Sequence, residues 1–69
     1  MEKLQISLAA ARVNAELTQE EVAHEMHVSK QTVLSWEKGN SEPSISQARR
    51  LSDLYKMPLE FIFLPEKSN

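Results

Sequence analysis

Two helix-start signals follow each other within residues 17–39, and this stretch constrains the fold more than any other feature of the chain. Thr18 and Glu21 have the spacing of a capping box, in which each side chain accepts a hydrogen bond from the other residue's backbone N–H. Ser29 is a suitable cap for a second helix. Gly39 suits the end of that helix, because glycine adopts a left-handed backbone without a Cβ clash. The stretch therefore predicts two short helices joined by a tight turn.

The apolar residues of this stretch predict how the two helices face. We expect the inward side chains to be Val22, Ala23, Met26, Val28, Val33 and Trp36. The first helix should end near His27, since histidine is enriched in the left-handed conformation that a tight turn needs. The second helix, residues 29–38, then keeps an outer face made of Lys30, Gln31, Leu34, Ser35 and Lys38.

The remaining segments also predict helices. An apolar stripe at helical spacing indicates a first helix over residues 4–15, formed by Leu4, Leu8, Ala11 and Ala15. After a loop at residues 40–43, Ser44 can cap a helix with a second stripe, made of Ile45, Ala48, Leu51 and Tyr55. Pro58 ends that helix region and can open a last short helix. The expected architecture is thus a compact all-α fold of five helices.

The predicted domain spans residues 1–64, and residues 65–69 are expected to form a flexible C-terminal tail. Its core is expected to contain Leu8, Ala11, Val22, Ala23, Met26, Val28, Val33, Trp36, Ile45, Leu51, Tyr55, Leu59 and Ile62.

Length and composition exclude several classes of protein. The 69 residues contain no cysteine, which excludes disulfides and thiolate metal sites. His24 and His27 are the two histidines and have no evident third ligand, so we predict neither a metal nor another cofactor. No apolar run is long enough for a bilayer, which favours a cytoplasmic protein without membrane contact. With no Gly-rich phosphate loop and no nucleophile beside a plausible base, we expect neither an enzyme nor a small-molecule ligand.

An ordered set of motifs resembles the Cro/repressor-type (Xre-like) helix-turn-helix family. The matching motifs are Leu17-Thr18-Gln19-Glu20-Glu21-Val22-Ala23, Val28-Ser29, Trp36-Glu37-Lys38-Gly39, Pro43-Ser44 and Pro58-Leu59-Glu60. The resemblance covers roughly residues 4–64 without a gap. It implies a five-helix lambda-repressor-like DNA-binding domain. It also implies a transcriptional regulator, a repressor, that binds double-stranded DNA as a homodimer with the helix over residues 29–38 in the major groove.

The resemblance also implies roles for single residues. The expected base-reading residues are Lys30, Gln31, Thr32 and Ser35. The expected phosphate contacts are Gln19, Ser29 and Lys38. Lysine can donate to O6 and N7 of guanine and glutamine can bond adenine, whereas the alternative for all of them is an ordinary solvated helix face. Arg12 and Glu37 match a pair that forms a structural salt bridge in the family, against the alternative of two exposed charges that contribute almost nothing.

Two features qualify the resemblance. The formal charge of −2 is unusual for a nucleic-acid binder, and the loop over residues 40–42 has no positive charge. They favour a second hypothesis, a protein-interaction module on the same fold, of an antitoxin-like or anti-repressor kind. Dimerisation is expected to come from this chain, and we assign its interface to Phe61, Phe63 and Leu64. These three side chains cannot all face the core of the domain from one short helix, so they should leave an apolar patch near the C-terminus.

Overall fold

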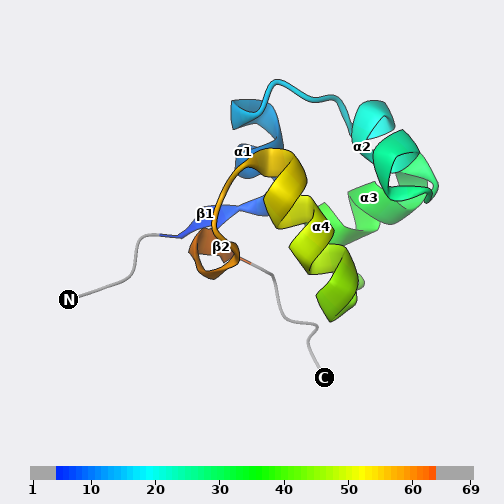
Figure 1. Ribbon diagram of the computed structural model, residues 1–69. Coiled ribbons are helices and arrows are strands. Elements are labelled where there is room, and N and C mark those ends of the chain that lie inside the picture. Colours follow the sequence, from blue (N-terminus) through cyan, green and yellow to red (C-terminus); the bar gives the residue numbers. More distant parts are fainter. Residues whose placement is uncertain (1–4, 64–69) are drawn as a thin grey trace.

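The computed structural model describes residues 5–63, except for the side chain of Phe63. It has the all-α helix-turn-helix architecture expected from the sequence (Figure 1). The elements, in chain order, are β1 (Ile6–Ser7), α1 (Leu8–Asn14), α2 (Gln19–Met26), α3 (Lys30–Lys38), α4 (Ile45–Tyr55), the 3-10 helix η1 (Leu59–Phe61) and β2 (Ile62–Phe63). The described residues thus hold four α-helices, where five helices were predicted. The predicted tail, residues 65–69, lies outside the described residues.

The segment predicted as a fifth helix forms one turn of 3-10 helix and then a strand. Pro58 precedes it with an extended backbone and provides no side-chain hydrogen bond to cap it. The N–H of Phe61 donates to the carbonyl of Pro58 at 2.9 Å. The two residues are three positions apart, which is the hydrogen-bond pattern of a 3-10 helix. Ile62 then extends to pair with another strand, so the helix cannot continue.

The first helix is shorter than predicted. It was expected over residues 4–15, but α1 begins at Leu8, because Ser7 caps it with an Oγ that accepts from the N–H of Ala10 at 3.0 Å. Leu4 lies outside the described residues.

The boundaries of α2 and α3 follow the predicted caps. The N–H of Glu21 donates to Thr18 Oγ1 at 3.0 Å, and the N–H of Thr18 donates to Glu21 Oε1 at 2.8 Å. His27 ends α2 with φ 59°, in the left-handed region. Ser29 Oγ caps α3 through the N–H of Thr32 at 3.1 Å, and Gly39 ends it with φ 81°. The sequence prediction of two short helices and a tight turn is confirmed.

The core lies where α1 packs against α3 and α4, while α2 packs against α3 and α4. Its buried residues are Leu8, Ala11, Val22, Ala23, Met26, Val33, Trp36, Leu51, Tyr55 and Ile62. The assignment of Ile45 to the core is wrong, since it is 73% exposed. It is the first residue of α4, and this end of the helix projects beyond the body of the molecule (Figure 1). Val28 and Leu59, also placed in the core, are only partly buried, whereas Ala48 is buried.

A two-stranded parallel sheet joins the beginning of the described chain to its end. Ile6 pairs with Ile62, and Ser7 pairs with Phe63. Figure 1 shows this pair on the side of α1 and α4 that faces away from α2 and α3. The sequence did not predict it. Within residues 5–63, no helix has the length and apolar character needed to cross a bilayer.

Candidate nucleic-acid interface

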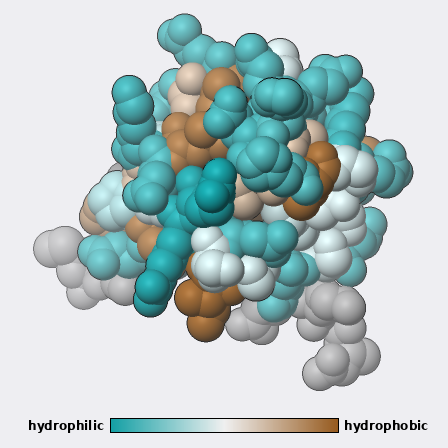
Figure 2. Space-filling model, turned by 45° about the vertical axis from the view of Figure 1, so that its right-hand side comes forward, coloured by the Kyte–Doolittle hydropathy of each residue, from teal (hydrophilic) through white to brown (hydrophobic). Residues whose placement is uncertain are grey.

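Helix α3 has one side fixed in the core and one side open. Val33 and Trp36 are 1% and 3% exposed, so they hold the helix against the body of the protein. The side chains of Lys30, Gln31 and Lys38 are exposed on the other side. In Figure 2, hydrophilic residues cover most of the visible surface and the apolar patches are small and separate. A rigidly held helix with a polar outer face is the geometry needed to insert side chains into a groove of DNA.

A shallow groove runs along the outer side of α3. It has a volume of about 190 Å³ and is lined by Gln31, Leu34, Ser35, Lys38 and Asn40. It therefore brings together three residues to which the sequence assigned a DNA contact, one apolar side chain and one loop residue. Asn40 had no assigned role, because nothing in its spacing shows that the loop folds back onto α3.

The hydroxyl of Ser35 contacts the loop that follows α3. Ser35 Oγ lies 2.8 Å from Ser41 Oγ, and the Ser35 carbonyl accepts from the N–H of Asn40 at 3.0 Å. A serine hydroxyl has one donor and two acceptor positions. Ser35 can therefore hold the loop against α3 and still bond to a base.

Ser29 and Thr32 are bonded to each other at the start of α3. Their hydroxyl oxygens lie 3.0 Å apart, in addition to the cap bond from the Thr32 N–H. The Thr32 side chain is half-buried, which leaves part of it facing outward. Both hydroxyls thus serve the local helix first, and a contact with DNA would use their remaining hydrogen-bonding positions.

Arg12 and Glu37 form an ion pair that joins α1 to α3. Arg12 Nε lies 2.7 Å from Glu37 Oε2, and Arg12 Nη2 donates to Glu37 Oε1 at 3.3 Å. The two side chains are 15% and 7% exposed. Arg12 Nη1 also donates to the carbonyl of Leu17 at 3.0 Å, which ties down the turn before α2. The hydrogen bond to Glu37 is the main reason why the pKa of Arg12 is raised.

Gln19 joins the same network from the first position of α2. Its Nε2 donates to Glu37 Oε1 at 3.0 Å, and its side chain is half-buried. The amide nitrogen has a second N–H, so one donor is left over. Sequence reasoning placed Gln19 on a DNA phosphate, but gave no sign that Glu37 would orient it.

Tyr55 is buried near this network and has a pKa raised to about 12. Burial is the main cause and the charge of Glu37 adds to it, while Arg12 lowers the pKa. Because the pKa of Tyr55 is higher in the folded protein than in the unfolded chain, the protonated phenol stabilises the fold. This contribution to the free energy of unfolding is fully present below pH 10 and is lost as the pH rises through about 12.

We therefore expect the free energy of unfolding to fall by about 2–3 kcal/mol more in the wild type than in Tyr55→Phe over that range. Urea denaturation at a series of pH values measures it, and comparison of the two proteins cancels the titration of the lysines. Parallel curves for the two proteins above pH 10 would contradict the expectation.

Lys30, the first residue of α3, pairs with Glu20 of α2. Lys30 Nζ lies 3.6 Å from Glu20 Oε2, and the side chains are 53% and 71% exposed. Glu20, like Asn40, is a residue of this region to which sequence reasoning assigned no part in the site. Glu20 lies in the first turn of α2, where a negative charge is favourable to the helix dipole, and this was the role that the sequence suggested. Nothing in the sequence indicated that its side chain would contact α3.

The described part of the assigned dimer interface lies in η1 and β2. Phe61 is 38% exposed and lies in η1, next to the paired strands. The backbone of Phe63 belongs to β2, and Leu64 lies outside the described residues.

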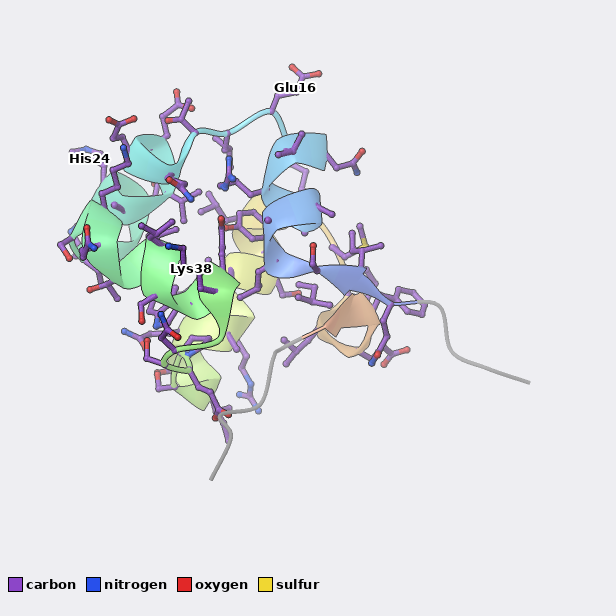
Figure 3. The ribbon with its side chains drawn as sticks, turned by 180° about the vertical axis from the view of Figure 1, so that it is seen from behind. Glu16, His24 and Lys38 are labelled. Carbon is purple, nitrogen blue, oxygen red and sulfur yellow. The ribbon has the colours of Figure 1, made fainter. Side chains whose placement is uncertain are left out.

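Three exposed polar side chains mark the outside of the molecule around α1, α2 and α3. Figure 3 shows Lys38 on α3, His24 on the neighbouring α2 and Glu16 after α1, each on the outside of the protein. Three or more His, Cys, Asp or Glu side chains nowhere come together as a metal site in the part of the chain from residue 5 to 63.

Comparison with known proteins places these observations in a family. A family model described as helix-turn-helix matches residues 8–62. The chain is 34% identical over 58 residues to the cryptic phage CTXphi transcriptional repressor RstR of Vibrio cholerae, covering 84% of this chain and 52% of that protein. It is 38% identical over 50 residues to an uncharacterized HTH-type transcriptional regulator of Methanocaldococcus jannaschii, covering 72% of this chain and 76% of that protein. The chain thus spans about half the length of one relative and three quarters of the other. No solved structure gives a significant match.

Proposed function

The chain belongs to the Cro/Xre-type helix-turn-helix family, and from this premise we propose that it is a sequence-specific DNA-binding transcriptional regulator. We further propose that it acts as a repressor in the cytoplasm. The observation that supports this function best is the anchoring of α3: its inner side is fixed by buried residues while Lys30, Gln31 and Lys38 remain exposed. Nothing in this role calls for catalysis, a cofactor or a small-molecule ligand.

In this proposal α3 enters the major groove and reads base edges. Lys30 donates to O6 and N7 of a guanine, and Gln31 bonds N6 and N7 of an adenine. Thr32 and Ser35 add hydroxyl contacts further along the helix. The order of these residues on one fixed helix would give a preference for a short base sequence.

Contacts to phosphates set the position of the protein on the duplex. Gln19 is held by Glu37 with one N–H left over, at a helix N-terminus whose backbone N–H groups attract an anion. Ser29 is the N-cap of α3, and Lys38 lies exposed at the other end of that helix. Since the chain has a net charge of −2, we expect few phosphate contacts and a shallow dependence of affinity on salt.

A homodimer would place two copies of α3 in successive major grooves. We propose that the surface around Phe61, with Phe63 and Leu64, forms the contact between the two copies. Phe61 supports this as an exposed aromatic ring directly before β2, and Figure 1 shows β2 on the side of the molecule away from α2 and α3. A contact there would leave both recognition helices open.

Selection of bound sites from a random double-stranded DNA library tests the function most directly. We expect two related half-sites whose centres lie about one helical turn apart, roughly 34 Å. Light scattering of the protein on the selected site gives the number of copies bound.

A selection that enriches no sequence, together with no binding to any DNA at low salt, would contradict the proposal. The same fold would then act as a protein-interaction module, the function that the net negative charge favours. A single selected half-site with one copy bound would contradict the homodimer alone.

A further inference from the structure

Leu34 is the apolar side chain of α3 that does not serve the core. Val33 and Trp36 are buried there, whereas Leu34 is only partly buried and does not pack against the core cluster found within residues 5–63. We propose that Leu34 is a specificity-determining residue, which reads the 5-methyl group of a thymine in the major groove. This inference rests on the proposed DNA-binding function, and it adds an apolar contact to the polar contacts assigned to α3.

The helical repeat places Leu34 among the residues assigned to DNA. Leu34 comes three residues after Gln31 and four residues before Lys38, so the three side chains lie on one face of the helix. With Ser35 and Asn40 they line the groove of about 190 Å³ on the outer side of α3. Figure 3 shows Lys38 on the outside of this helix. When Gln31 contacts a base, Leu34 therefore faces the DNA one helical turn further along.

The loop after α3 holds one wall of this groove in place. Ser35 Oγ lies 2.8 Å from Ser41 Oγ, and the carbonyl of Ser35 accepts from the N–H of Asn40 at 3.0 Å. Because these bonds join the loop to the helix, the groove is formed in the free protein. Leu34 is thus presented to a ligand from a groove whose other lining side chains are polar.

The chemistry of the major groove selects the partner of this side chain. Every base edge presents hydrogen-bond donors or acceptors there, and the 5-methyl group of thymine is the apolar group among them. A donor or acceptor placed against Leu34 loses water and gains no hydrogen bond, which weakens binding. A thymine methyl placed there buries apolar surface instead, which strengthens binding about fourfold for one methyl group. Leu34 therefore favours thymine over the other bases at one position of each half-site.

Replacing single thymines of the selected site by deoxyuridine tests this inference, because deoxyuridine pairs in the same way and lacks only the 5-methyl group. At one thymine of each half-site, the replacement should weaken binding of the wild type about fourfold. Leu34→Ala should bind the thymine and uracil duplexes equally at that position, since its side chain is too short to reach the methyl group. Leu34→Met should keep the difference, since methionine is also apolar and of similar volume. Fluorescence anisotropy titrations measure the ratio of the two affinities for each protein.

Ile45→Ala is the matched control. It removes a large apolar side chain that is 73% exposed on α4, and it should keep the wild-type preference for thymine. Urea denaturation of Leu34→Ala should give a free energy of unfolding close to that of the wild type, because Leu34 does not pack against the core. The comparison of thymine with uracil in the wild type needs no variant, so it tests the inference even if a substitution disturbs folding.

Three results would show that the inference is wrong while the proposed function stands. The wild type could bind thymine and uracil duplexes equally at every position, or Leu34→Ala could keep the preference for thymine. The selected half-site could also contain only G·C pairs. If the wild type selects no sequence and binds no DNA at low salt, the proposed function fails and the inference fails with it.

Discussion

Arg12→Met is expected to lower the free energy of unfolding by about 3 kcal/mol, the largest effect on stability that we predict. The substitution keeps an apolar stem of similar length but leaves the Glu37 carboxylate, which is 7% exposed, without its guanidinium partner. It also removes the hydrogen bond that holds the carbonyl of Leu17. Urea denaturation followed by the fluorescence of Trp36 measures the change.

Two further variants isolate the cause of that loss. Adding Glu37→Leu to Arg12→Met removes the unpaired carboxylate, so most of the lost stability should return. Lys30→Met breaks the exposed pair with Glu20 and should cost less than about 1 kcal/mol. Equal losses for Arg12→Met and Lys30→Met would mean that the partly buried pair has no special importance for the fold.

Lys30→Ala and Gln31→Ala are each expected to weaken binding to the selected site by about 1–3 kcal/mol. Each substitution removes hydrogen-bond donors that no other residue of α3 replaces. A base-edge acceptor that is shielded from water in the groove is then left without a hydrogen bond, which weakens binding. The loss should be accompanied by relaxed discrimination at one base pair of each half-site. Titration of the selected site and of its single-base variants measures both quantities.

Lys56→Asn controls for the loss of positive charge. Lys56 is exposed at the end of α4 in a left-handed conformation with φ 55°, which asparagine tolerates. This variant should weaken binding to all sequences slightly and equally. If Lys30→Ala and Gln31→Ala discriminate between bases as the wild type does, the assignment of base reading to these residues is wrong.

The parts of the fold that the sequence predicted well are those set by local chemistry. The caps are made by side chains that accept hydrogen bonds from backbone N–H groups three residues away, those of Thr18, Glu21 and Ser29. The residue types at this spacing are therefore enough to predict where the two helices begin. Likewise, His27 and Gly39 adopt left-handed backbones because a helix must end there, whatever it packs against.

The parts that the sequence did not predict depend on distant partners. Ile45 continues the apolar stripe of α4, but helical spacing alone cannot show that its side chain is exposed. The strand at Ile62 replaces an expected helix because Ile6 is there to pair with it. Neither fact is present in the residues of the segment itself.

The same reason explains which features of the candidate site were missed. Residues on one face of α3 follow from the helical repeat, so the outer face of that helix was foreseen. The bonds of Gln19 to Glu37 and of Ser35 to Ser41, and the pair of Glu20 with Lys30, join different elements. Their existence depends on how α2, α3 and the following loop are placed, and a single sequence does not show this.

The pairing of β1 with β2 has a consequence for the order in which the protein folds. Ile6 and Ile62 are separated by nearly the whole described chain, so their contact closes a long loop at a high cost in chain entropy. The helices α2 and α3 are joined by a short turn and can meet early. We therefore expect the strands to pair last during folding and to separate first during unfolding. Amide hydrogen exchange should show that the N–H groups of the strands exchange through an opening of lower free energy than those of α2 and α3. The helix pair α2–α3 should then remain folded in molecules whose β1 and β2 have separated.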